Sequence, residues 1–236
     1  MLMSCEVKTP QEVPLNSELQ IHYSLISEGK TGSARVRIRQ YMDLQGETTQ
    51  PLFLMGLSYH QEKKYTKAVQ WFNRAAEFDE PSNRYPPTWH FLAWSHYYLG
   101  NRVASKQAFH RYLKLNPQEG DSLFGLGLLA MDEGFIEEAM QLFHRSIASQ
   151  PDRPTGRAKA MARLADLLSE NGEWTNAVSL YEEALQLDED LYEAWYHLAM
   201  ALRRLQRDQE YKEALLMFDE TRQRVRPELH GTGFPE

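Results

Sequence analysis

The chain has little of several features that mark common functional classes. Its single cysteine, Cys5, excludes an internal disulfide framework and a zinc site made of several cysteines. No apolar run approaches the roughly 18 consecutive residues that a membrane-spanning helix needs. The net charge of −7 argues against general nucleic-acid binding, which requires clustered Lys and Arg at the phosphates. We therefore expect no transmembrane span and no nucleic-acid partner.

Signatures of catalysis and of cofactor binding are missing too. The sequence contains no HExxH, GxSxG or CxxCH motif. The fragment GKT at 29–31 is not a phosphate-binding loop, because the upstream glycine of that motif would have to stand at Ser24. His90 and His96 are six apart, which places them on different sides of a helix. We expect a protein that is not an enzyme and that holds no metal and no cofactor.

What the sequence does contain is a helical hairpin over residues 121–151. Apolar residues recur three and four apart in 123–131 and in 135–147, which is the period of amphipathic helices. Gly134 interrupts the pattern between them, and Pro151 ends the second helix because its ring and missing N–H cannot continue the ladder. Gly127 is the small residue where the two helices would touch.

The hairpin pattern returns along the chain with an underlying period of 34 residues. Small residues equivalent to Gly127 follow one another at intervals of 37, 34, 38 and 34: Gly56, Ala93, Gly127, Ala165 and Ala199. Large residues keep the same spacing, at Phe72, Phe109, Phe143 and Tyr181, and so do turn glycines, at Gly100, Gly134 and Gly172. Proline-rich insertions account for the two longer steps. The sequence therefore predicts stacked repeats that share one extended core.

This pattern, covering roughly residues 50–225, resembles the tetratricopeptide repeat, whose 34-residue unit orders Trp, Leu, Gly, Tyr, Gly, Tyr, Ala, Phe, Ala and Pro in the same way. The resemblance implies an all-α, right-handed α-solenoid of stacked helix–turn–helix repeats, with a concave face that binds peptide segments of other proteins. Two departures are Ser105, where alanine is usual, and a three-residue insertion before Ala214.

The repeat spacing divides the chain into segments. Five repeats are expected within residues 49–226, at about 50–79, 86–117, 120–151, 155–188 and 190–226. We interpret residues 15–48 as a degenerate first repeat, although apolar and basic residues alternate over 34–41, which would also suit a strand. An extended tether is expected at 1–14 and a C-terminal tail at 227–236.

By resemblance to the family, the first helix of every repeat lines the concave groove. The residues at the groove positions are Phe53, Leu57, His90, Phe91, Trp94, Tyr97, Tyr98, Phe124, Leu128, Met131, Arg163, Tyr196, Arg203 and Arg204, with His60, Asp166, His197 and Met200 also among them. The groove would then be aromatic in its middle and charged at its end. Rigid rings bury much area at little entropic cost, so they suit partner binding, but packing against a neighbouring repeat would explain any one of them equally well. Phe53, Leu57 and Phe91 stand where chaperone-binding members carry a carboxylate clamp, so we do not expect that ligand.

Charge and the N-terminus bear on the partners. Residues 1–118 carry 14 basic and 10 acidic side chains, a net of +4, whereas residues 119–236 carry 12 and 23, a net of −11. We predict a cytoplasmic scaffold whose partner is a protein or peptide segment, with self-association through the terminal repeats as an option. Alternatively, Leu2, Ser4 and Cys5 fit the end of a bacterial lipoprotein processing box. A lipid-anchored envelope protein would then assist assembly of a secretion, outer-membrane or electron-transfer complex.

Overall fold

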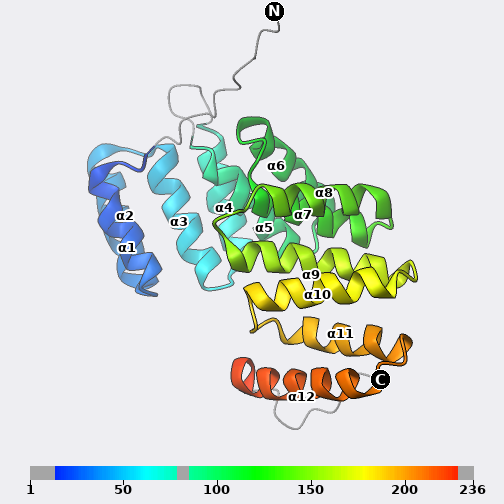
Figure 1. Cartoon of the computed structure of the whole chain (residues 1–236). Helices are drawn as coiled ribbons and strands as arrows, with labels where there is room; N and C mark the ends of the chain where they lie inside the picture. Colours follow the sequence, from blue (N-terminus) through cyan, green and yellow to red (C-terminus); the bar gives the residue numbers. More distant parts are fainter. Residues whose placement is uncertain (1–13, 79–84, 228–236) are drawn as a thin grey trace, which may run out of the picture. The chain divides into compact units, whose positions relative to one another are not determined.

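The computed structural model describes residues 14–78 and 85–227, which form twelve α-helices and no strand (Figure 1). The chain divides into two compact units, Met1–Pro117 and Gln118–Glu236, and each is treated by itself. The predicted all-α class is confirmed. Cys5, the tether up to residue 13 and the tail from residue 228 lie outside the described residues.

The helices pair into hairpins in chain order. Unit 1 holds α1 (Ser17–Ser27), α2 (Thr31–Gln45), α3 (Thr49–Gln61), α4 (Tyr65–Ala76), α5 (Pro87–Tyr98) and α6 (Arg102–Leu115). Unit 2 holds α7 (Gly120–Asp132), α8 (Ile136–Ala148), α9 (Pro154–Glu170), α10 (Trp174–Leu187), α11 (Tyr192–Arg204) and α12 (Asp208–Val225). Residues 34–41 lie inside α2, so their helical interpretation is confirmed and the strand alternative is wrong.

Every hairpin turns at one residue in the left-handed region of backbone space. These residues are Gly29, Lys63, Gly100, Gly134, Gly172 and Gln206, with φ between 57° and 83°. In each case the following N–H reaches back to a carbonyl five residues earlier, for example from Phe135 to Ala130 at 2.9 Å. This bond satisfies a carbonyl that the end of the first helix would otherwise leave without a partner. One turn geometry is therefore shared by all six hairpins, the first included.

The core of two hairpins, α3–α4 and α7–α8, is a large ring set against a glycine. Phe72 and Phe143 are 0% exposed, and a Cβ added to Gly56 or Gly127 would lie 2.5 Å from their ring carbons. Only glycine permits that approach of helix to ring. Ser105, the departure from alanine, is also 0% exposed, and its Oγ donates to the Ala93 carbonyl at 2.9 Å. The hydroxyl is thus buried with a partner.

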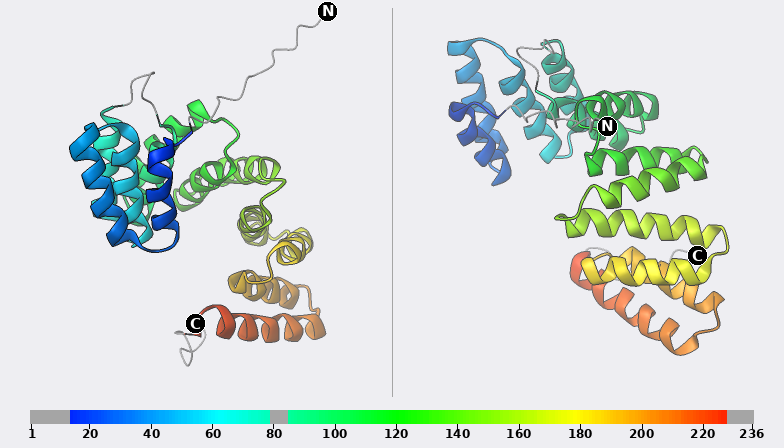
Figure 2. Two further views of the ribbon diagram at one scale, coloured as in Figure 1. Left: turned by 90° about the vertical axis from the view of Figure 1, so that its left-hand side faces the viewer. Right: turned by 45° about the horizontal axis from the view of Figure 1, so that its top comes forward.

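Within each unit the hairpins stack side by side, as the views in Figure 2 show. A helix packs mainly on the helices before and after it, but the first helices also contact one another: α1 with α3, α3 with α5, α7 with α9, and α9 with α11. Each unit consequently has a first-helix face, built from these contacting helices. No described helix is both long enough and apolar enough to cross a membrane.

Candidate functional site

On the first-helix face of unit 1, aromatic rings pack on one another. Phe53 is 2% exposed, and its ring centroid lies 5.7 Å from that of Phe91. Trp94, 9% exposed, meets Phe109 edge to face at 5.3 Å and stacks on Tyr98 at 5.9 Å. Edge-to-face and offset rings at these distances add to the stability gained from burial alone. The aromatic cluster therefore belongs in large part to the core of unit 1.

The predicted groove residues of unit 1 differ in how much surface they leave to a partner. Leu57 is buried like Phe53 and Trp94, whereas His90, Phe91 and Tyr97 are half-buried. Tyr98 is 52% exposed. Tyr98 is thus the ring with most surface to offer, and its part in binding stays a prediction.

His60 sits within this aromatic cluster and titrates abnormally. Its ring is 5.4 Å from Phe91, and burial, together with the nearby His90, lowers the pKa of His60 to about 4. The Oγ of Ser95 lies 2.9 Å from Nδ1 of His60 and gives its own proton to the Phe91 carbonyl. Neutral His60 must therefore carry its proton on Nδ1 and donate to Ser95.

In unit 2 the first-helix face opens into a pocket of about 870 Å³. It brings together four of the predicted groove residues, Met131 of α7, Arg163 of α9, and Arg203 and Arg204 of α11. Asp166, Trp174, Tyr181, His197 and Met200 also line it. Of these, Asp166, His197 and Met200 stood at groove positions in the sequence, whereas Tyr181 was expected only as a packing residue.

Asp166 is the polar centre of this pocket. Its side chain is only 9% exposed; Oδ1 accepts the Tyr181 hydroxyl proton at 2.6 Å, and Oδ2 accepts from Arg163 at 2.8 Å. Nδ1 of His197 lies 3.9 Å from Oδ1, and its ring stacks on Tyr181. Burial, and then the adjacent Asp166 carboxylate, raise the pKa of Tyr181 well above its usual value, so the phenol stays protonated.

Arg163 is held from two sides. Besides Asp166, it donates to Glu193 of α11 at 3.1 Å. Burial alone would lower the pKa of Arg163, but these two carboxylates raise it, so the charge is fixed in the pocket wall. A guanidinium fixed in advance loses little conformational freedom when a ligand arrives.

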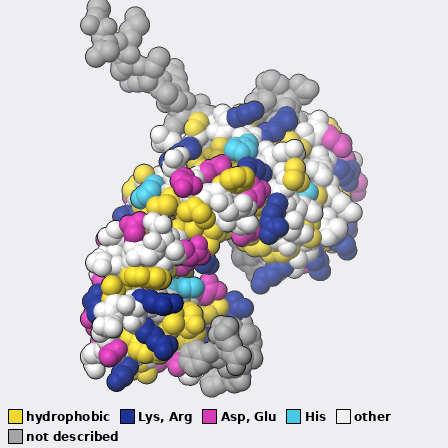
Figure 3. All heavy atoms as spheres, turned by 90° about the vertical axis from the view of Figure 1, so that its right-hand side faces the viewer, with side chains coloured by type: hydrophobic (Ala, Val, Ile, Leu, Met, Phe, Trp, Pro, Cys, Tyr) yellow, Lys and Arg dark blue, Asp and Glu magenta, His cyan; other side chains and the backbone are white. Residues whose placement is uncertain are grey.

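The other two arginines are exposed and rest on rings. Arg204 lies over Trp174 at 5.7 Å from the ring centroid, and Arg203 over Tyr211 at 5.8 Å. Such contacts orient a guanidinium without occupying its N–H donors. The lower part of Figure 3, where the C-terminal helices lie, shows Lys and Arg side chains beside acidic and hydrophobic ones. The surface there is mixed in charge.

Three predicted groove residues of unit 2 lie outside the residues that line this pocket. Phe124 and Leu128 of α7 are half-buried, and the ring of Phe124 is 5.8 Å from Phe143. Tyr196 of α11 packs on Phe218 at 5.4 Å. Among the described residues, no group of three or more His, Cys, Asp or Glu side chains is placed to hold a metal ion.

One position in the repeat accounts for the polar centre of the unit 2 pocket. The residue after the small contact residue is Leu57 in α3, Trp94 in α5 and Leu128 in α7, where the facing ring is phenylalanine. In α9 it is Asp166, and there the facing ring is Tyr181. A buried phenol needs an acceptor, and Asp166 supplies it. The polar pocket follows from this paired exchange.

Comparison with known proteins agrees with the repeat architecture. Family models described as tetratricopeptide repeat match residues 49–81, 92–154 and 160–191, which together exceed half of the chain. Two curated proteins of Komagataeibacter xylinus, both described as cellulose synthase operon protein C, are 39% and 33% identical over 66 residues. That match spans 28% of this chain but only 5% of theirs.

Solved structures share the fold at low sequence identity. Pseudomonas aeruginosa PilF has a TM-score of 0.73 at 16% identity, covering 89% of this chain and 90% of that one. Cut9 in complex with Hcn1 has a TM-score of 0.73 at 15% identity, covering 89% and 39%. YrrB, described as a TPR protein with an unusual peptide-binding site, has a TM-score of 0.58 at 14% identity, covering 80% and 92%. With its repeated hairpins, shared turns and ring-on-glycine packing, the chain belongs to the tetratricopeptide repeat family.

Proposed function

We propose that this protein is a non-catalytic scaffold that captures a peptide segment of a partner protein in the unit 2 pocket. One observation carries the proposal: Arg163, fixed between Asp166 and Glu193, shares a pocket with two further arginines and with methionine side chains. Pockets of several hundred cubic ångströms that combine apolar walls with a few placed polar groups are typical binding sites.

The lining suits a peptide that has both an acidic group and an apolar side chain. Arg203 and Arg204 keep N–H donors for a carboxylate or a backbone carbonyl, and bonds of that kind are the stronger hydrogen bonds in proteins. Met131 and Met200 are half-buried and adapt readily to apolar side chains of different shapes. We expect Arg163 to set the direction of the bound segment, because its guanidinium is fixed.

The comparisons support binding in general terms. The repeat fold is one that serves protein–protein interaction, and YrrB of the same fold is described as having a peptide-binding site. The partner of this chain is to be found by capture from lysate of the source cells, followed by mapping of the bound segment on overlapping peptides.

The test compares two double variants of equal charge change. Arg203→Gln with Arg204→Gln removes two exposed guanidinium groups from the pocket, whereas Arg145→Gln with Lys212→Gln removes two exposed charges from α8 and α12. We expect the first to weaken binding of the mapped peptide by about tenfold or more and the second by less than about twofold. Equal weakening would show that charge, and not the pocket, governs binding, and would contradict the proposal.

A second candidate function is assembly of a complex in a bacterial envelope. It is favoured by the 66-residue likeness to cellulose synthase operon protein C, a bacterial protein. If Cys5 is the lipidated residue, Cys5→Ser should move the protein from the membrane fraction of the source cells to the supernatant. An unchanged distribution between fractions would count against this candidate and leave the cytoplasmic scaffold.

A further inference from the structure

One hairpin of unit 1 carries no acidic residue. Residues 81–118 contain neither Asp nor Glu, in a chain that has 33 of them. Helices α5 and α6 of this hairpin carry four basic residues, Arg102, Lys106, Arg111 and Lys114, and three histidines, His90, His96 and His110. The hairpin is therefore cationic within an acidic protein.

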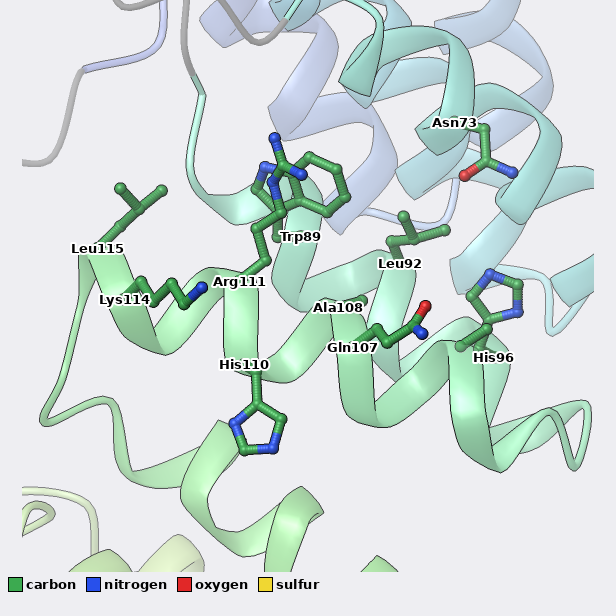
Figure 4. A pocket seen from close by; sticks show the side chains of 11 residues that line it. Asn73, Trp89, Leu92, His96, Gln107, Ala108, His110, Arg111, Lys114 and Leu115 are labelled. Carbon is green, nitrogen blue, oxygen red and sulfur yellow. The ribbon is translucent and has the colours of Figure 1, made fainter.

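A pocket of about 790 Å³ opens on the second-helix side of this hairpin (Figure 4). Its walls come from α4, α5 and α6, and include Trp89, His96, Gln107, Arg111 and Lys114. Trp89, Leu92 and His96 of α5 face it, whereas the predicted groove residues of α5 are different ones. This pocket is distinct from the first-helix face. Among the described residues, no carboxylate lines it.

Two cationic side chains of this pocket, Arg111 and Lys114, have defined places in its wall. Arg111 reaches from α6 to the Trp89 ring of α5, 4.4 Å from the ring centroid, and the two side chains lie together in Figure 4. Lys114 follows Arg111 by three residues, which puts both on one side of α6. Gln107, one turn earlier, adds an amide donor beside His96.

His96 adds a further donor. Burial lowers the pKa of His96, so the ring is neutral at pH 7. The amide nitrogen of Asn101 lies 3.3 Å from Nδ1 and donates to it, which leaves the ring proton on Nε2. The polar lining thus consists of Arg, Lys, amide and imidazole groups that can all donate, and the complementary ligand is rich in acceptors.

We propose that this pocket is a second binding site, which takes an acidic peptide segment of a partner protein. A carboxylate side chain pairs with Arg111 and Lys114, while a neighbouring backbone carbonyl accepts from Gln107 or His96. Nucleic acid fits less well, because its binding needs a track of cations along a phosphate backbone, and here the cations lie in one pocket of a chain with net charge −7.

The probe for this site is a fluorescein-labelled oligo-glutamate peptide, with oligo-glutamine as its uncharged counterpart, followed by fluorescence anisotropy on the full chain. Arg111→Gln with Lys114→Gln is the test variant. Arg37→Gln with Arg39→Gln, two exposed residues of α2, makes the same charge change outside the pocket. We expect about tenfold weaker binding for the test variant and less than about twofold for the control. Binding should also weaken as salt is raised.

Several results would overturn the proposal. Equal loss in both double variants, equal binding of oligo-glutamine, or no binding of oligo-glutamate at low salt each removes it. Tighter binding of a single-stranded oligonucleotide, lost in the test variant, would assign the pocket to nucleic acid. A rise in molar mass with concentration, seen by light scattering and lost in the test variant, would assign it to the acidic half of a second copy. Because the arginines of the unit 2 pocket also attract acidic peptides, both double variants are compared in a chain that carries Arg203→Gln and Arg204→Gln, so the two sites are tested separately.

Discussion

The two units are built from the same repeat, but their first-helix faces differ. In unit 1 the first-helix face is closed by rings, with Phe53 and Trp94 buried against neighbours. In unit 2 the corresponding face holds a buried carboxylate, Asp166, and a pocket. The repeat fixes where helices touch, through the small residue and the ring, but leaves the adjacent position open. When an acidic residue replaces the apolar one at that position, and tyrosine replaces the facing phenylalanine, the apolar face becomes a polar site.

The largest expected effect comes from breaking the Asp166–Tyr181 pair. Asp166→Leu leaves a buried phenol without its acceptor and Arg163 with one carboxylate fewer, and should lower the free energy of unfolding by about 3 kcal/mol. Tyr181→Phe alone should cost about 1–2 kcal/mol. The double variant recreates the apolar arrangement of unit 1, so we expect it to be more stable than Asp166→Leu alone.

Urea unfolding followed by circular dichroism measures this cycle. The coupling energy between the two positions is obtained from the wild type, both single variants and the double variant. Losses that simply add would contradict the view that the two residues form one exchanged pair.

His60 should make the stability of unit 1 depend on pH. The folded pKa of His60 is lowered to about 4 from 6.5, so the unfolded chain takes up the proton first as pH falls. The free energy of unfolding is therefore unaffected by His60 above pH 6.5. Between pH 6.5 and pH 4 it falls by about 3 kcal/mol, because the unfolded chain binds a proton that the folded chain does not. Glu62 acts in a lower window: Lys64, Thr31 and Arg35 lower its pKa to about 2, so its contribution is lost from pH 4.5 downwards.

Denaturant unfolding at several pH values tests this assignment. His60→Gln should flatten the dependence between pH 6.5 and 4, whereas His144→Gln, an exposed residue of α8, should leave it as in the wild type. The same slope in the His60 variant would assign the dependence to another group.

The approach of helix to ring at Gly127 can be broken by one methyl group. Gly127→Ala would place a Cβ 2.5 Å from the Phe143 ring. Overpacking costs about 1–3 kcal/mol, and the better helix propensity of alanine offsets about 1 kcal/mol, so a net loss of about 1 kcal/mol is expected. Thermal unfolding would measure it. If Phe143→Leu in the same chain makes the alanine tolerable, the clash is the cause; no rescue would point elsewhere.

The smallest effect concerns the turns. Lys63 and Gln206 adopt φ of 57° and 60°, where the other four turns have glycine. Lys63→Gly removes left-handed strain of about 1–2 kcal/mol but adds freedom to the unfolded chain, so the net gain should be about 0.5 kcal/mol. Gly134→Ala is the matched reverse change and should cost about 1 kcal/mol. If both substitutions destabilise, the shared turn geometry does not control stability.

Much of this architecture could be predicted from the sequence, because residues with the same packing role recur in several repeats at the same spacing. Gly56 and Gly127 mark the closest helix contacts, and Phe72 and Phe143 the rings that fill them, at one spacing. The sequence pattern did not show which of the predicted groove residues are exposed and which are buried in the core. A first helix that contacts the first helices beside it buries part of the face that would otherwise meet a partner, as Phe53 shows.

The sequence by itself determined the helical hairpins, their period and their turns, because these depend on local spacing of small, large and glycine residues. Only the tertiary structure decided which polar groups meet. Tyr181 and Asp166 are 15 residues apart on different helices, and Arg163 reaches Glu193 across 30 residues. Trp89 and Arg111 likewise join through the packing of α5 on α6. These contacts depend on how far each side chain extends from its own helix to the next one. The spacing of residues in a repeat does not specify that distance.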